Sequence, residues 1–173
     1  MKIMMILLFL ISNGCNANID NPIKAESEEI QSEFAILTTP KGEIHIKFLP
    51  NKAPETVLRI KKLISDKFYH GIQFHRVVPN FVIQAGDPTG TGVGGSGKKI
   101  KAEFNDEIHT KGTVAMARLG HDVDSADSQF YIALSTLPHL DKKYTVFGKV
   151  IKGLNVLDEI KKGDKIISFD LKK

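Results

Sequence analysis

The chain has 173 residues, of which 42% are apolar and 25% are charged, and its formal net charge is +4. These values are ordinary for one soluble globular domain that buries its own core. The single cysteine excludes an internal disulfide framework. The mild positive charge is scattered, with no basic stripe interleaved with aromatic residues, which argues against a nucleic-acid-binding protein.

The first residues have the pattern of a secretory signal. An apolar run over 3–11 is too short to span a bilayer, and small or polar residues then lead to Cys15. We expect residues 1–14 to be a lipoprotein-type signal peptide and Cys15 to become a lipidated N-terminus, although Ser12 stands where an aliphatic residue is usual. Ordinary cleavage near Ala17 and a cytosolic protein with an apolar start are the alternatives. The prediction is an exported protein, periplasmic or in the cell envelope, whose only membrane contact is a lipid anchor at Cys15.

Residues 15–32 are polar and acidic, which predicts a flexible tether, and the folded domain is expected over 33–173. Segments 34–39 and 43–49 alternate apolar and polar residues around a Pro-Lys-Gly turn. This alternation predicts two strands with one buried face. A helix is predicted over 51–66, because a proline suits its first turn and its apolar residues recur on one side.

Segment 74–87 has the pattern of two short strands joined by a Pro-Asn turn. A permanent cation, Arg76, lies among its apolar residues, and such a charge is costly to desolvate unless it has a partner. The hairpin also contains Phe81 and Gln84, and we expect both to meet Arg76 on one concave patch. The alternative is an ordinary edge-strand arginine whose charge extends into water.

The glycine-rich segment 87–101 contains a GxGxxG pattern and most of a phosphate-binding loop. No helix start follows it, and Lys99 stands where a Ser or Thr would bind magnesium. We therefore expect a surface loop with positive φ at several glycines rather than a nucleotide site. The polar loop 120–127 carries His121 and three aspartates but lacks the glycine and the late glutamate of a calcium loop. It is predicted to be a solvated acidic loop, and no metal site is expected.

Four further strands are predicted over 113–117, 129–134, 144–150 and 165–171, and a second helix over 153–161. The strands are short and are joined mostly by turns or loops, which is typical of an antiparallel barrel. The predicted fold class is mainly β, a closed eight-stranded antiparallel barrel capped by two α-helices.

The string FHRVVPNFVIQAGD over 74–87 resembles the core signature of the cyclophilin-type peptidyl-prolyl cis-trans isomerases. The resemblance continues through 128–132 and 144–150 and extends from residue 34 to the C-terminus. It implies a cyclophilin-like barrel, an isomerase (rotamase) that speeds rotation about X-Pro bonds, proline-containing polypeptides as partners, and no cofactor. We expect a monomer.

The resemblance also carries the family's site onto this sequence, position by position. Arg76 matches the catalytic arginine, and Gln84 matches the glutamine that steadies this arginine and a substrate carbonyl. The other matches are substrate-binding positions, which comprise a proline cup of Phe81, Val82, Tyr131 and Leu140, a substrate-pairing strand with Ala117 and Arg118, and the pocket residues Gln129, His139 and Tyr144.

Several positions depart from the residues that are common in the family. Tyr131 stands where phenylalanine is commonest, Val82 where methionine is frequent, Arg118 where asparagine is frequent and Tyr144 where histidine is frequent. His139 falls where many members carry a tryptophan that is linked to cyclosporin binding. The sequence therefore predicts weakened inhibition by cyclosporin with catalysis retained.

Rotation about an X-Pro bond breaks no covalent bond, so no nucleophile, metal or cofactor is required. Its barrier of about 18–20 kcal/mol comes from amide resonance, and an arginine aimed at the proline nitrogen lowers it by stabilising the twisted amide selectively. The leading hypothesis is an isomerase that acts during folding of exported proteins. The alternative is a chaperone-like module that binds proline segments with little turnover, and a nucleotide-binding protein is a third hypothesis.

Overall fold

The computed structural model describes residues 33–172. The predicted signal peptide, the tether and Cys15 lie outside the described residues. One sheet of eight antiparallel strands dominates the structure, in the order β3-β4-β6-β5-β7-β2-β1-β8. The strands are β1 (Phe34–Thr39), β2 (Gly42–Phe48), β3 (Arg76–Val78), β4 (Val82–Ala85), β5 (Thr113–Met116), β6 (Phe130–Ala133), β7 (Val146–Lys152) and β8 (Ser168–Lys172).

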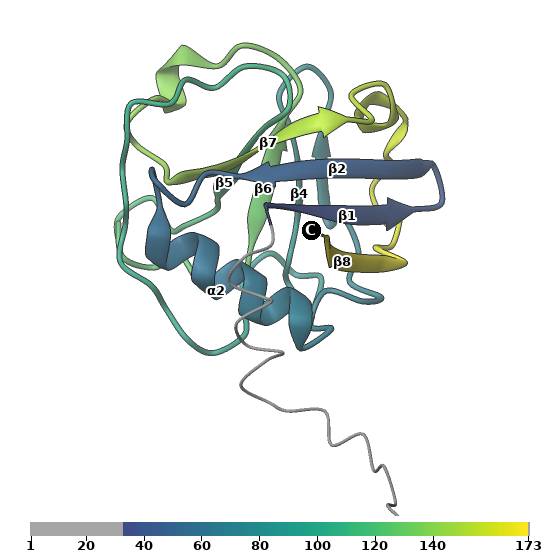
Figure 1. The fold of residues 1–173 in the computed structure, drawn as a ribbon, viewed down its shortest axis with the longest axis horizontal. Helices are drawn as coiled ribbons and strands as arrows, with labels where there is room; N and C mark the ends of the chain where they lie inside the picture. Colours follow the sequence, from purple (N-terminus) through teal and green to yellow (C-terminus); the bar gives the residue numbers. More distant parts are fainter. Residues whose placement is uncertain (1–32, 173) are drawn as a thin grey trace, which may run out of the picture.

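The sheet is strongly curled, and β1 and β2 cross in front of β4 and β6 in Figure 1. Its edge strands β3 and β8 do not pair as strands, but the segments before them meet around an isolated bridge between Gln73 and Lys165. Four backbone hydrogen bonds between 71–74 and 163–166 also join these two segments. The predicted closed barrel is therefore corrected to a curled sheet whose edge strands do not pair and whose edges meet only through the short segments before them.

Within residues 33–172 there is one α-helix, α2 (Pro54–Ser65), which lies across the lower part of the domain in Figure 1. Pro54 stands at its start, where a missing N–H costs nothing, and Lys62 lies in its last turn, where a cation is favoured. Its buried side includes Val57, Ile60 and Leu63. The helix predicted over 51–66 is confirmed, with slightly narrower limits.

The second predicted helix, over 153–161, is wrong. The structure has only a short 3-10 helix, η2 (Val156–Glu159), and another at η1 (Pro138–Leu140). Gly153 has a φ of 90°, which is outside the right-handed helical region, and Ile160 is already extended. Val156 and Leu157 are nevertheless buried, so the apolar pattern identified the inward side but not the type of turn. Within residues 33–172 no helix has the length and apolar character needed to cross a bilayer.

Two hydrophobic clusters lie on opposite sides of the same strands. The larger one fills the inside of the curled sheet and includes Ile83, Met116 and Ile132. The smaller one covers the outer side of β4, β5 and β6 and consists of Val82, Ala115, Tyr131, Ala133, Leu137 and Val146, with Leu49, Phe81, Ala117, Leu140 and Tyr144 packed against it. Because side chains alternate along a strand, one short segment contributes to both clusters. The outer cluster forms the floor of the candidate site.

Candidate active site

The hairpin of β3 and β4 places Arg76 directly opposite Gln84 in the strand register. Its turn is closed by Phe81 N–H donating to the Val78 carbonyl, and Asn80 adopts the left-handed conformation that asparagine tolerates. The Arg76 guanidinium lies over the Phe81 ring, 5.3 Å from its centroid, and donates to Gln84 Oε1 over 3.4 Å. The predicted meeting of these three residues is confirmed. Arg76 is exposed, so its charge is kept at the surface above an aromatic ring.

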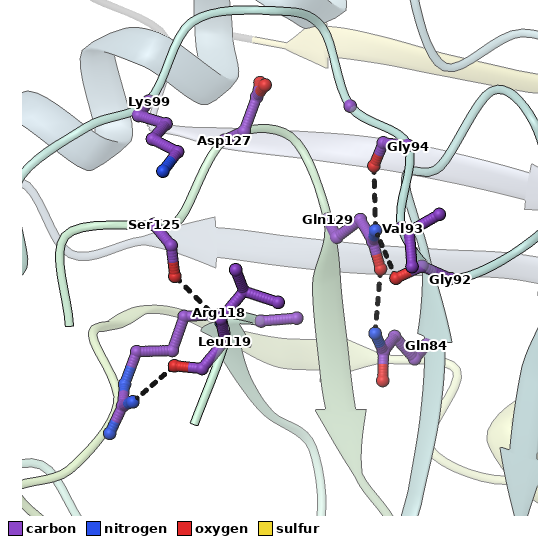
Figure 2. Close-up of a pocket in the computed structure, with 12 residues that line it drawn as sticks. Gln84, Gly92, Val93, Gly94, Lys99, Arg118, Leu119, Ser125, Asp127 and Gln129 are labelled. Atoms are coloured by element: carbon purple, nitrogen blue, oxygen red, sulfur yellow. Dashed lines mark hydrogen bonds between the residues drawn. The ribbon is translucent and has the colours of Figure 1, made fainter. Parts of the chain in front are cut away.

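A chain of amide hydrogen bonds orients Gln84. Its Nε2 donates to Gln129 Oε1 over 2.9 Å, and Gln129 Nε2 donates to the carbonyls of Gly92 and Gly94 over 3.0 and 2.8 Å. Figure 2 shows these groups in a line from the strand to the glycine-rich loop. Since the nitrogen end of Gln84 is occupied by Gln129, its oxygen is left facing Arg76.

A groove of about 230 Å³ lies beside Arg76 on the outer side of the sheet. Nine of the eleven predicted site residues line it, namely Arg76, Phe81, Val82, Gln84, Ala117, Arg118, Tyr131, Leu140 and Tyr144. They come from β3, β4 and β6, from the turn between β3 and β4, from the segment directly after β5, and from η1 and the segment between it and β7. The structure therefore brings together residues that are far apart in the sequence.

The two remaining predicted residues lie at the edges of this groove. Gln129 lines a neighbouring pocket of about 190 Å³. His139 is exposed and stacks on Phe81, with ring centroids 5.8 Å apart and an angle of 10° between the planes. His139 therefore extends the aromatic rim beyond the lining residues.

The neighbouring pocket contains residues that the sequence analysis did not identify. Its lining is shared with the groove at Gln84, Ala117 and Arg118 and continues with Gly92, Val93, Gly94, Gly95, Lys99, Leu119, Ser125, Asp127 and Gln129. Figure 2 shows that these residues come from the glycine-rich loop on one side and from the loop before β6 on the other. No motif within either loop indicates the pocket, because it exists only where the loops meet.

Arg118 is held by backbone carbonyls on the side of the groove opposite Arg76. Its Nε and Nη2 donate to the Lys143 carbonyl over 3.1 and 3.0 Å, and its Nη1 donates to the Leu119 carbonyl over 2.8 Å. The guanidinium also lies 4.7 Å from the centroid of the Tyr144 ring. The side chain thus fixes the position of a groove wall, a role that the sequence analysis did not foresee.

The glycine-rich segment is a loop with positive φ at Gly90, Gly92 and Gly97, as predicted. Its amides are bound by the protein's own carboxylates. Asp87 accepts hydrogen bonds from the Gly92 and Thr89 amides, and Asp127 accepts from the amides of Ser96 and Gly97. These amides are therefore not available to a phosphate.

The acidic loop differs in part from the prediction. Asp127 is not simply solvated, because its hydrogen bonds to the glycine-rich loop hold it partly buried. Asp122 and Asp124 accept from Lys99 and from the Ala102 amide, so they also anchor neighbouring chain. Among residues 33–172 no three His, Cys, Asp or Glu side chains gather in a way that could hold a metal ion.

Two histidines lie near the site without lining the groove. His75 is 8% exposed, and burial lowers the pKa of its ring, so the neutral form is favoured behind the hairpin. His109 is fully buried and hydrogen-bonds to the hydroxyl of Tyr131, a residue whose ring lines the groove. The role of His109 is not readable from the sequence, because no motif surrounds it and its partners are distant in the chain.

Comparison with known proteins gives one family. The chain matches the family described as "Cyclophilin type peptidyl-prolyl cis-trans isomerase/CLD" over residues 34–169. A peptidyl-prolyl cis-trans isomerase of Synechococcus elongatus is 46% identical over 139 residues, which cover 79% of this chain and 94% of the relative. One of Helicobacter pylori is 42% identical over 156 residues, which cover 86% and 94%.

Solved structures agree with this relationship. The crystal structure of a cyclophilin type peptidyl-prolyl cis-trans isomerase of Cryptosporidium parvum has a TM-score of 0.77 at 28% identity, covering 82% of this chain and 98% of that one. A second structure of that protein, in the presence of the dipeptide Ala-Pro, has a TM-score of 0.75 at 27% identity, covering 81% and 99%. The chain belongs to the cyclophilin-type peptidyl-prolyl cis-trans isomerases.

Proposed function

We propose that this isomerase binds proline-containing polypeptides in the groove and that Arg76 is its catalytic residue. As an X-Pro bond twists, the proline nitrogen regains a lone pair and becomes a hydrogen-bond acceptor. A guanidinium that donates to this nitrogen binds the twisted amide better than the planar one, and only such differential binding raises the rate. The observation that carries this proposal is the Arg76 guanidinium beside Gln84 and Phe81 at the rim of an apolar groove.

The size of this effect can be bounded. A hydrogen bond to a charged group contributes about 1.5–3 kcal/mol, and each 1.36 kcal/mol of differential stabilisation is about tenfold in rate. One bond from Arg76 therefore gives about 10- to 100-fold, and more where the donor is held in place before the reaction. Gln84 provides such a hold, because its amide is fixed by Gln129.

The groove suits a proline ring in both size and chemistry. Phe81, Val82, Tyr131 and Leu140 supply an apolar cup, and the volume of about 230 Å³ leaves room for a proline with part of its neighbours. The relative solved in the presence of Ala-Pro supports this class of substrate. We assign Ala117, Arg118, Gln129, His139 and Tyr144 to contacts with the residues that flank the proline.

The chain further acts, in our proposal, on exported proteins from a lipid anchor at Cys15. The support is the sequence alone, with its apolar run over 3–11 and a cysteine after small or polar residues. Mass spectrometry of the native N-terminus tests this assignment. A diacylglyceryl cysteine at position 15 supports it, whereas an N-terminus near Ala17 or an intact Met1 contradicts it.

The catalytic assignment is tested with Arg76→Ala, Arg76→Lys and the control Lys152→Ala, which removes an exposed cation at the end of β7. We expect Arg76→Ala to reduce kcat/KM at least about 100-fold in a protease-coupled assay with an Ala-Ala-Pro-Phe peptide. Arg76→Lys retains the charge but not the forked guanidinium, so its activity is expected to lie between that of Arg76→Ala and that of the wild type. Thermal unfolding is expected to stay unchanged in all three.

The same experiment separates an isomerase from a binding module. Peptide affinity, measured by NMR titration, is expected to change little in Arg76→Ala while turnover is lost. If turnover is unchanged in Arg76→Ala, Arg76 is not the catalytic residue. If the wild-type protein binds the peptide and does not accelerate its isomerisation, the chain is a proline-segment binder.

A further inference from the structure

A buried line of three side chains ends in the wall of the groove. Asp141 Oδ1 accepts a hydrogen bond from His109 Nδ1 over 2.9 Å, and His109 Nε2 is 2.8 Å from the hydroxyl of Tyr131. His109 is 0% exposed and Tyr131 is 5% exposed, whereas Asp141 is only partly buried. Of the three, only Tyr131 lines the groove.

The donor and the acceptor of each hydrogen bond in this line follow from the chemistry of the three groups. The His109 backbone and ring N–H groups hold the pKa of Asp141 below its usual range, so Asp141 is a carboxylate that can only accept. The His109 ring therefore donates to Asp141 through Nδ1, and the tautomer with the proton on Nδ1 leaves Nε2 as an acceptor. Burial raises the pKa of the Tyr131 phenol, so this hydroxyl remains protonated and donates to Nε2.

The line also joins segments that are distant in the sequence. His109 precedes β5, Asp141 follows η1 and Tyr131 lies in the middle of β6. Asp141 accepts from the His109 backbone amide as well, and the Leu137 amide donates to the His109 carbonyl over 2.8 Å. These backbone hydrogen bonds hold His109 in place, so its ring can orient Tyr131 through the bond to the hydroxyl.

We propose that His109 and Asp141 are positioning residues of this isomerase, which hold the Tyr131 ring against the substrate proline by binding its hydroxyl on the side away from the groove. The proposal rests on the proposed function of the groove. The Tyr131 ring is stacked on His109, with centroids 5.9 Å apart, and meets Tyr144 edge-on at 5.7 Å. Its orientation is therefore set from behind and from one side, while the ring itself provides the apolar surface of the cup.

Two amide variants of His109 separate positioning from simple filling of space. The amide of Gln reaches the place of Nε2 and can still accept from Tyr131, whereas the amide of Asn reaches only the place of Nδ1 and can still donate to Asp141. We expect His109→Asn to raise KM and the peptide Kd about three- to tenfold, the size of one hydrogen bond, with kcat nearly unchanged. His109→Gln is expected to stay within about twofold of the wild type.

Tyr131→Phe removes the same hydrogen bond by deleting its donor. It tests the proposal even if a His109 variant does not fold. It keeps the ring and removes the donor, so we expect a rise in KM and peptide Kd of about threefold. In the Tyr131→Phe background His109→Asn is expected to have no further effect on peptide Kd, because no bond is left to break.

The probe throughout is the Ala-Ala-Pro-Phe peptide, used for turnover and for NMR titration. Equal peptide Kd values for the Asn and Gln variants, or additive effects in the double variant, overturn the positioning role. Loss of thermal stability with an unchanged Kd also overturns it. Since affinity is measured without turnover, this outcome is independent of the Arg76 result, which alone decides whether the groove is catalytic.

Discussion

The outer sides of two parts of the sheet differ sharply, although their inner sides are alike. In β1 buried and partly exposed residues alternate, and β2 follows a similar pattern, so that only the inner side is covered. In β5 and β6 every residue is buried, which means that both sides are covered. The site lies on the part with two buried sides, because an apolar cup requires apolar residues where a surface strand normally carries polar ones.

The strongest test of this difference places one carboxylate on the outer side of β5 and one on the outer side of β2. Ala115 is 0% exposed beneath the groove, so Ala115→Asp buries an unpaired charge, and we expect a loss of at least about 3 kcal/mol in the free energy of unfolding. Lys47→Asp introduces the same group on the exposed side of β2 opposite Lys149 and is expected to change it by less than about 0.5 kcal/mol. Urea unfolding of both variants measures the difference, and similar losses would contradict the distinction.

Protonation of Asp87 at acid pH is expected to destabilise the glycine-rich loop beside the site. Burial by itself raises the pKa of Asp87, but hydrogen bonds from Thr89 and Gly92 outweigh it and hold the pKa well below its ordinary range. A carboxyl with a lowered folded pKa stabilises the protein fully above its unfolded pKa of about 3.9, and this contribution is lost as the pH falls below that value.

We expect amide-exchange protection at Thr89 and Gly92 to decrease between about pH 4 and pH 2, whereas protection of β1 and β2 decreases later. Asp87→Asn, which cannot titrate, is expected to be less stable at neutral pH by about 2 kcal/mol and to lose its acid dependence in this loop. An unchanged acid dependence in this variant would assign the effect to another carboxyl group.

A smaller effect is expected at Arg118, which binds the carbonyls of Lys143 and Leu119 from two different loops. Arg118→Lys keeps the charge but cannot bond the Lys143 and Leu119 carbonyls together, so the Tyr144 wall loses its brace. We expect KM for the proline peptide to rise about threefold, with thermal unfolding lowered by a few degrees at most. Lys111→Gln, which removes a cation that pairs with Asp158, is the control and is expected to leave KM unchanged.

The smallest effect on turnover is expected at His139. Its ring lies on Phe81 outside the groove lining, so His139→Trp is expected to change kcat/KM by less than about twofold. The same substitution is expected to strengthen inhibition by cyclosporin, because the larger indole extends the apolar rim. The peptide assay measures kcat/KM, and cyclosporin titrations of the wild type and of His139→Trp measure inhibition. Nanomolar inhibition of the wild-type protein would refute the prediction that His139 weakens binding of the drug.

The hairpin part of the site could be predicted from its local pattern, whereas the other lining residues were placed by the resemblance to the family. Arg76 and Gln84 are opposite each other in a short hairpin, so their meeting follows from the turn between them. His109 and Asp141 could not be found in this way, since each lies in a loop and their common partner Tyr131 lies in β6. The second helix failed for a similar reason, as its apolar spacing was correct but the positive φ at Gly153 was not visible in the pattern.

The sequence by itself determined the strands, the helix α2 and the family, because strand alternation, the apolar spacing of the helix after its first-turn proline, and the string over 74–87 are local properties of the chain. Only the tertiary structure decided that the edges of the curled sheet meet through two short segments, that two carboxylates bind the amides of the glycine-rich loop, and that a buried histidine lies behind the groove. These features depend on hydrogen bonds between segments that are distant in the sequence, and such bonds are specified by how the strands pack rather than by any spacing within them.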